Sequence, residues 1–180
     1  MEDTYPWILD EKEAIKNFVI EIRKPYLGIC LGAQLLGEVI GGKIVKTKPP
    51  EIGILNIEML ATHFKDKVFR NFDSTFKVLQ WHSYEVQDLE SVNDVFLLAS
   101  SESTKYQIFR YKDYAYGVQF HTEIKEDTIS SWGKITELKE VIENNLGKNA
   151  LHLFEKEGNK NIKNMKLNTE KLYENFKKIL

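Results

Sequence analysis

Apolar residues at helical spacing open the chain. Residues 8–22 carry apolar side chains on one face, with acidic residues early in the segment, which predicts an amphipathic helix that begins near Pro6. The short apolar run over residues 26–29 predicts a buried strand, and residues 33–40 predict a second helix that ends at Gly41 and Gly42. Helix, strand and helix in this order predict an αβα unit with parallel packing.

Short runs of β-branched and aromatic residues dominate the middle of the chain. They predict strands over residues 43–46, 52–60, 75–81, 95–100, 106–111 and 115–120. Residues 47–50 divide the first two runs, and Lys112-Asp113 predicts a hairpin between the last two. The expected fold is therefore α/β: an open, mostly parallel sheet that is flanked by helices and has an antiparallel portion.

The last third of the chain is polar and helical. Apolar residues recur there at helical spacing at Ile135, Leu138, Val141, Ile142 and Leu146. The Asn- and Lys-rich residues 159–166 predict a linker, and residues 167–180 predict a final amphipathic helix. We therefore expect a domain over residues 1–130 and a polar helical extension over residues 131–180 that packs on it.

Composition narrows the class of protein. The chain has 180 residues, 42% hydrophobic and 29% charged, which suits a soluble globular domain. A net charge of −2 lacks the excess of basic residues that is typical of nucleic-acid-binding proteins, so no nucleic-acid partner is expected. No apolar run approaches the roughly 18 residues that span a bilayer, so we expect no membrane partner. A single cysteine excludes an intramolecular disulfide and fits a reducing compartment, so the cytoplasm is expected.

That cysteine lies at a strand-to-helix junction, in Gly28-Ile-Cys30-Leu-Gly32. The Gly-x-Ser-x-Gly turn of α/β-hydrolases has the same mechanics: flanking glycines allow a tight turn that lifts the nucleophile out of the sheet. The partial positive charge of a helix N-terminus favours a thiolate. The alternative interpretation of Cys30 is a buried core cysteine beside a glycine-rich turn.

A cysteine nucleophile needs a base and a group that orients the base. Of the four histidines, we expect His63 to be exposed, and we assign no role to it or to His152. His121 directly follows an apolar strand, and the carboxylate of Glu123 can turn back towards its imidazole. No spacing suits a closed metal site, so no metal is expected.

Together, Gly28-Ile-Cys-Leu-Gly-Ala-Gln34 and Gly117-Val-Gln-Phe-His-Thr-Glu123 resemble the class I glutamine amidotransferase family. Three further stretches resemble the branch related to the glutaminase domain of GMP synthase: Tyr5-Pro-Trp7, Glu51-Ile-Gly53 and Gln80-Trp-His-Ser-Tyr84. The resemblance covers roughly residues 1 to 125.

The resemblance implies hydrolysis of the glutamine side-chain amide through a cysteinyl thioester, without a cofactor. It makes Cys30 the nucleophile, His121 the proton carrier and Glu123 the group that orients it. The backbone N–H of Leu31 supplies half of the oxyanion hole.

The resemblance also implies a substrate site. Gln34 occupies a substrate-contacting position, and Ser83 and Tyr84 fall in a loop whose main chain holds the amino-acid end of glutamine. His82 is expected to shape that loop.

In the family, a Gly-Gly segment supplies the other oxyanion donor, and it belongs to an opening portion that precedes the part matched here. The resemblance thus implies an N-terminally truncated domain: a mis-called start codon, a shortened gene, or a chain whose open sheet edge is covered by a synthetase partner or a second copy. Two rival functions are a γ-glutamyl hydrolase of the same fold and a catalytically silent remnant that binds a partner.

Overall fold

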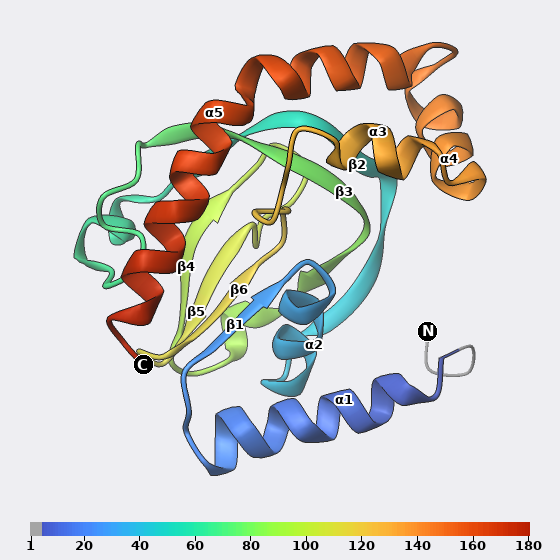
Figure 1. Ribbon diagram of the computed structural model, residues 1–180. Coiled ribbons are helices and arrows are strands. Elements are labelled where there is room, and N and C mark those ends of the chain that lie inside the picture. Colours follow the sequence, from blue (N-terminus) through green and yellow to red (C-terminus); the bar gives the residue numbers. More distant parts are fainter. Residues whose placement is uncertain (1–4) are drawn as a thin grey trace.

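Within residues 5–180, six strands form one curled, mixed sheet in the order β1-β6-β5-β4-β2-β3 (Figure 1). The computed structural model describes residues 5–180, except for the side chains of residues 137 and 138, so Leu138 lies outside the described side chains. The strands are β1 (Tyr26–Ile29), β2 (Lys43–Met59), β3 (Thr75–Gln87), β4 (Val95–Ser100), β5 (Ile108–Tyr111) and β6 (Ala115–Val118). The α/β class is confirmed. Within residues 5–180, parallel pairing is confined to β1 and β6, so the antiparallel portion is larger than expected.

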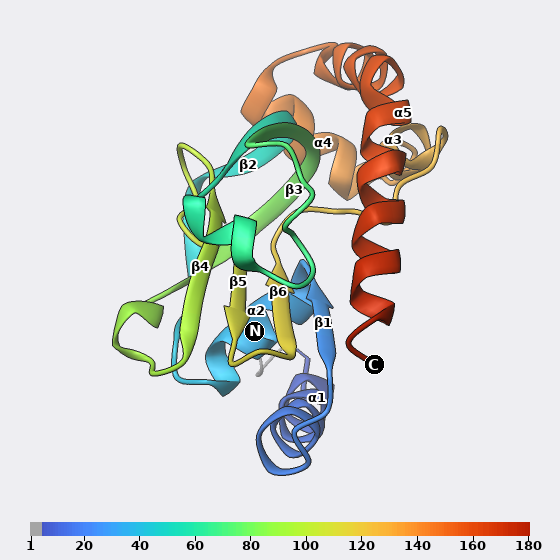
Figure 2. The same cartoon turned by 90° about the vertical axis from the view of Figure 1, so that its left-hand side faces the viewer.

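The first predicted helix is confirmed, and it ends in a turn of π-helix. The helices are α1 (Trp7–Lys16) with its π-helical continuation (Asn17–Glu21), α2 (Leu31–Val39), α3 (Thr128–Gly133), α4 (Thr136–Leu146) and α5 (Ala150–Lys177). Short 3-10 turns occupy Ala61–Lys65 and Leu89–Ser91. In both views α1 lies at one end of the molecule and α3 and α4 at the other (Figures 1 and 2).

The predicted linker over residues 159–166 is wrong, because α5 runs through it without a break. Phe154, Gly158, Ile162 and Met165 recur every three or four residues and pack in one apolar cluster or against it. A side chain at Gly158 would collide with Ile129 of α3. The packing of this face holds the polar segment in a helix, although its composition is typical of a loop.

Separate apolar clusters lie against α2 and against α5. Leu35 and Leu36 of α2 pack with residues of α1 and with Ala115 of β6. Tyr116, the next residue of β6, packs instead in the cluster that contains Leu172 of α5. This alternation along β6 is the period-two pattern of a strand that is buried on both faces.

The two predicted strands over residues 43–46 and 52–60 form a single long strand, β2. It pairs with β3 on both sides of an irregularity between Lys46 and Glu51. Because β3 continues to Gln87 alongside it, Ser83 and Tyr84 lie in a strand, and their predicted placement in a loop is wrong.

Candidate active site

Cys30 lies between the end of β1 and the start of α2. Its backbone adopts φ 49° and ψ −103°, a positive φ that is uncommon for a residue with a side chain. Its N–H donates to the carbonyl of Val118, 2.8 Å away, which ties the turn to β6. A Cβ atom at Gly28 would lie 2.4 Å from the backbone carbonyl of Gly32, so the turn requires glycine at position 28. The sulfur is held at a strained, partly exposed corner.

His121 reaches the same corner from the end of β6. The backbone N–H of His121 donates to the carbonyl of Leu79 at 2.9 Å, which forms an isolated bridge to β3. Its Nδ1 lies 2.6 Å from Oε1 of Glu123, and the other carboxylate oxygen accepts the N–H of Thr122 at 2.9 Å. With Nδ1–H donating to the carboxylate, Nε2 is the nitrogen left to face Cys30.

The surroundings of His121 favour its charged form. Burial alone lowers the pKa of His121, but hydrogen bonding and charge attraction from Cys30 and Glu123 outweigh it and raise the pKa to about 9. Burial likewise raises the pKa of Glu123, but the hydrogen bond and charge of His121 prevail and lower it. The structure therefore brings Cys30, His121 and Glu123 into one electrostatically coupled group.

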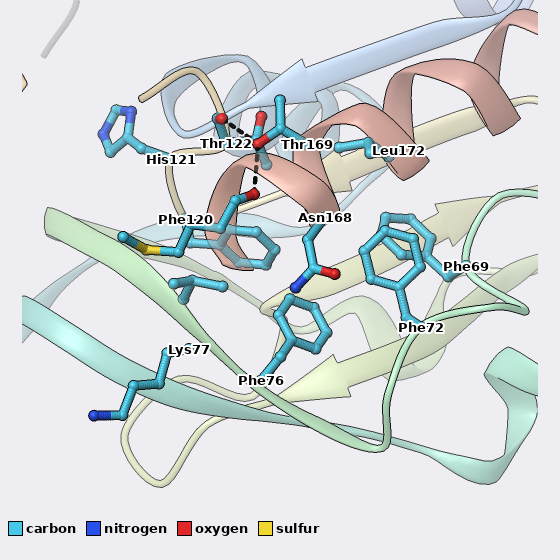
Figure 3. Close-up of a pocket in the computed structure, with 12 residues that line it drawn as sticks. Phe69, Phe72, Phe76, Lys77, Phe120, His121, Thr122, Asn168, Thr169 and Leu172 are labelled. Carbon is cyan, nitrogen blue, oxygen red and sulfur yellow. Dashed lines mark hydrogen bonds between the residues drawn. The ribbon is translucent and has the colours of Figure 1, made fainter. Parts of the chain in front are cut away.

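The C-terminal helices touch this group. The ring of Trp132, from α3, meets His121 edge to face, with centroids 5.0 Å apart and an interplanar angle of 75°. Trp132 also packs on Trp81 at 4.9 Å. From α5, the hydroxyl of Thr169 donates to the carbonyl of Thr122 at 2.6 Å (Figure 3). Neither Trp132 nor Thr169 is predictable as a site residue from the sequence, because each contacts His121 or its neighbour only through the folded chain.

Gln34 is buried beside the cysteine. Its Nε2 donates to the carbonyl of Tyr84 at 2.7 Å and to Oε1 of Gln119 at 3.2 Å, so both of its N–H groups are occupied and Oε1 is left. Leu31 is the first residue of α2, with its backbone at the helix start. Ser83 makes no hydrogen bond to these groups within residues 5–180.

Behind Tyr84 lies a buried acid–imidazole pair. His82 and Glu51 are 2.9 Å apart, with side chains 1% and 4% exposed. The other nitrogen of His82 lies 2.9 Å from the carbonyl of Tyr84. Burial alone raises the pKa of Glu51, but hydrogen bonds led by those from His82 and Ser101 outweigh it and lower the pKa to about 2.

Another histidine, His63, and a small crevice beside α5 are not included in the site. His63 is 1% exposed, with Nδ1 2.6 Å from the carbonyl of Leu60, so its predicted exposure is wrong: the short turn Ala61–Lys65 folds the ring inwards. A crevice between α5 and the sheet, lined by Phe76, Phe120 and Leu172, has a volume of about 20 Å³, the space of one water (Figure 3). The imidazole of His121 points away from it (Figure 3), so we place no substrate there.

Among the described residues, no group of three His, Cys, Asp or Glu side chains is placed to hold a metal ion. Within the same residues, no helix is long and apolar enough to cross a membrane.

The family model described as "Glutamine amidotransferase class-I" matches residues 3–131. A subunit of the glutamine-hydrolyzing GMP synthase of Sulfurisphaera tokodaii is 34% identical over 110 residues, which are 61% of this chain and 56% of that protein. The protein of the same name from Sulfolobus acidocaldarius is 33% identical over 118 residues, 65% of this chain and 60% of that one. The chain thus spans less than two thirds of the length of these curated relatives. The crystal structure of a glutamine amidotransferase from Thermotoga maritima matches with a TM-score of 0.82 and 27% identity, over 98% of this chain and 72% of that one.

Proposed function

Because the chain belongs to the class I glutamine amidotransferase family, we propose that it hydrolyses the side-chain amide of glutamine to glutamate and ammonia. One observation carries the proposal. Cys30 stands at positive φ between β1 and α2 and faces His121, whose Nδ1 is held by Glu123 at 2.6 Å. These are the parts that a cysteine hydrolase needs: a nucleophile, a base, and a group that fixes the base.

The proposed reaction starts from a Cys30 thiolate beside a His121 imidazolium. The sulfur attacks the amide carbon, and the oxyanion that forms accepts the N–H of Leu31 at the start of α2. His121 gives its proton to the departing nitrogen, so ammonia leaves and a glutamyl thioester remains. Water then loses a proton to His121 and attacks the thioester, which releases glutamate and restores the thiolate. Glu123 stabilises the imidazolium throughout. The proposed cycle uses no cofactor or metal.

Gln34, Ser83 and Tyr84 are the proposed substrate contacts. The Tyr84 carbonyl already accepts two hydrogen bonds, from Gln34 and His82, so its lone pairs are occupied. The groups we assign to the amino-acid end of glutamine are therefore Oε1 of Gln34 and the main chain of Ser83 and Tyr84, apart from the Tyr84 carbonyl.

A partner is proposed to receive the ammonia. Both curated relatives are named as subunits, which supports a separate synthetase chain in that role. Strand β1 is the last strand at one edge of the described sheet, with β6 as its neighbour there, and its outer edge offers backbone groups for pairing with a synthetase or a second copy. The free thiol that this chemistry needs favours a reducing compartment, and we propose the cytoplasm.

The test is ammonia release from glutamine by the purified chain, with Cys30→Ala alongside. We expect release that Cys30→Ala abolishes without loss of fold, that His121→Ala nearly abolishes, and that Glu123→Gln lowers less, because Glu123 orients and does not transfer protons. Release that survives in Cys30→Ala would overturn the assignment. A panel of γ-glutamyl peptides separates the glutaminase from a γ-glutamyl hydrolase. A folded chain that releases nothing, by itself or with a synthetase, would favour the silent binding protein.

A further inference from the structure

The side chain of Gln119 reaches the sulfur of Cys30 from the end of β6. It is 1% exposed, and its Nε2 lies 3.8 Å from Sγ, within the range of a hydrogen bond to sulfur. Its Oε1 accepts from Nε2 of Gln34 at 3.2 Å. Gln119 is thus the last member of a buried chain of hydrogen bonds that ends at the nucleophile.

The orientation of both amides follows from one fixed acceptor. A side-chain amide fits two ways round, and its hydrogen-bond partners decide which is present. The carbonyl of Tyr84 can only accept, so Gln34 must turn its NH₂ group towards it, at 2.7 Å. The second N–H of Gln34 then meets Oε1 of Gln119. This leaves the NH₂ group of Gln119 facing Cys30, where it donates.

The fixed acceptor is itself held by the buried Glu51–His82 pair. His82 approaches the Tyr84 carbonyl with Nδ1 and the Glu51 carboxylate with Nε2, each at 2.9 Å. The Tyr84 carbonyl can only accept, so Nδ1–H of His82 is the donor to it. Ser101 and Gln107 donate to the two oxygens of Glu51 at 2.7 and 2.8 Å.

We propose that Gln119 is a further catalytic residue of this site, an amide donor that stabilises the Cys30 thiolate, and that the Glu51–His82 pair positions it through Tyr84 and Gln34. The proposal rests on the proposed role of Cys30 as nucleophile. A hydrogen bond to a charged group favours the charged form, and a buried amide donates without adding a second charge. The titratable groups that face this chain of hydrogen bonds are His121 and Glu123 beside the sulfur, and Glu51 and His82 behind Tyr84.

The test is the rate of Cys30 alkylation by iodoacetamide as a function of pH. Only the thiolate reacts, so the profile reports its population without any glutamine turnover. In Gln119→Leu we expect the midpoint of the profile to move to higher pH by about one unit, so that alkylation is about tenfold slower at pH values below the native midpoint, from the loss of one hydrogen bond to a charged group. The matched control is Gln80→Leu, because Gln80 is 0% exposed and its amide atoms have no partner within the described residues. Gln80→Leu should keep the native profile.

Two further variants separate the donor from its support. Gln119→Asn withdraws the amide from the sulfur while remaining polar, and it should move the midpoint in the same direction. Glu51→Gln should move it less, because it loosens the Tyr84 carbonyl and leaves Gln119 in place. If glutaminase activity is present, kcat should fall in Gln119→Leu with little change in KM.

A folded Gln119→Leu or Gln119→Asn variant with the native alkylation profile would overturn the role of Gln119. A folded Glu51→Gln variant with the native profile, next to a shifted Gln119 variant, would overturn the positioning role of the Glu51–His82 pair. Ammonia release from glutamine that survives in Cys30→Ala would instead undermine the proposed function, and the alkylation profiles of the Gln119 variants are read independently of it.

Discussion

Replacing Glu51 by glutamine should cost the fold a measurable share of its stability. Glu51 is 6% exposed, and its carboxylate accepts from His82, Ser101 and Gln107. Glutamine keeps the shape of the side chain but removes the charge, and it turns an NH₂ group towards donors. The substitution therefore mimics a protonated carboxyl group at this position.

The magnitude follows from the pKa of Glu51. The structure lowers it from 4.5 to about 2. At about 1.4 kcal/mol per unit, the charged form is worth about 3 kcal/mol to the folded chain at neutral pH. Because the folded-state pKa is depressed, this contribution is fully present above pH 4.5 and is lost as the pH falls towards 2. Glu51→Gln should therefore lower the free energy of unfolding by about 3 kcal/mol at pH 7.

Urea denaturation of the chain and of Glu51→Gln, followed by circular dichroism between pH 3 and 7, measures this difference. The gap should be largest at pH 7 and narrow as the pH falls below 4.5. Glu58→Gln is the control, since Glu58 lies exposed on the same strand and should change stability by less than about 0.5 kcal/mol. A gap at pH 7 below about 1 kcal/mol, or a gap that stays constant down to pH 3, would refute the electrostatic reasoning.

Two more predictions concern the shape of the site. Gly28→Ala should destabilise the fold by more than about 3 kcal/mol, because its Cβ would lie 2.4 Å from backbone atoms. The control is Gly32→Ala, whose Cβ would meet only the Tyr26 hydroxyl, at 3.3 Å, and which should change stability by less than about 1 kcal/mol. Equal losses of stability in urea denaturation would contradict the turn geometry. Trp132→Ala should lower kcat for glutamine roughly three- to tenfold through the lost ring contact with His121, and Trp132→Phe should restore most of it. The exposed Trp7→Ala is the control for the second experiment.

The parts of the fold that the sequence predicts well are those set by local pattern. Strand β1, helix α2 and the β5–β6 hairpin lie within two residues of their predicted bounds, because glycines, turn residues and apolar runs mark their ends. Strand β2 is continuous because it pairs along β3, and α5 is continuous through residues 159–166 because of its packing. In both cases the partners lie far away in the chain. The Asn- and Lys-rich stretch is helical because its apolar face packs against α3 and the sheet, and no window of sequence contains that information.

The same division holds at the site. Cys30 and His121 are predictable because each follows a strand with a recognisable motif, and the structure brings them together. Gln119 also stands in a motif, but its role depends on the orientation of Gln34, which is fixed by a carbonyl of β3. The pairing of Glu51 with His82 joins residues on two strands, and only their register reveals it. Such polar networks are specified by tertiary geometry and leave no periodic signal.

The contact between Trp132 and His121 has a consequence for how the domain is divided. The family match ends at residue 131, so the ring that packs on His121 comes from the segment directly after it. Thr169, further along in α5, donates to the carbonyl of Thr122, the residue next to His121. A histidine at the end of a strand has freedom to turn, and these two contacts restrict it. The helices that composition describes as a polar extension are therefore best regarded as part of the wall of the proposed active site.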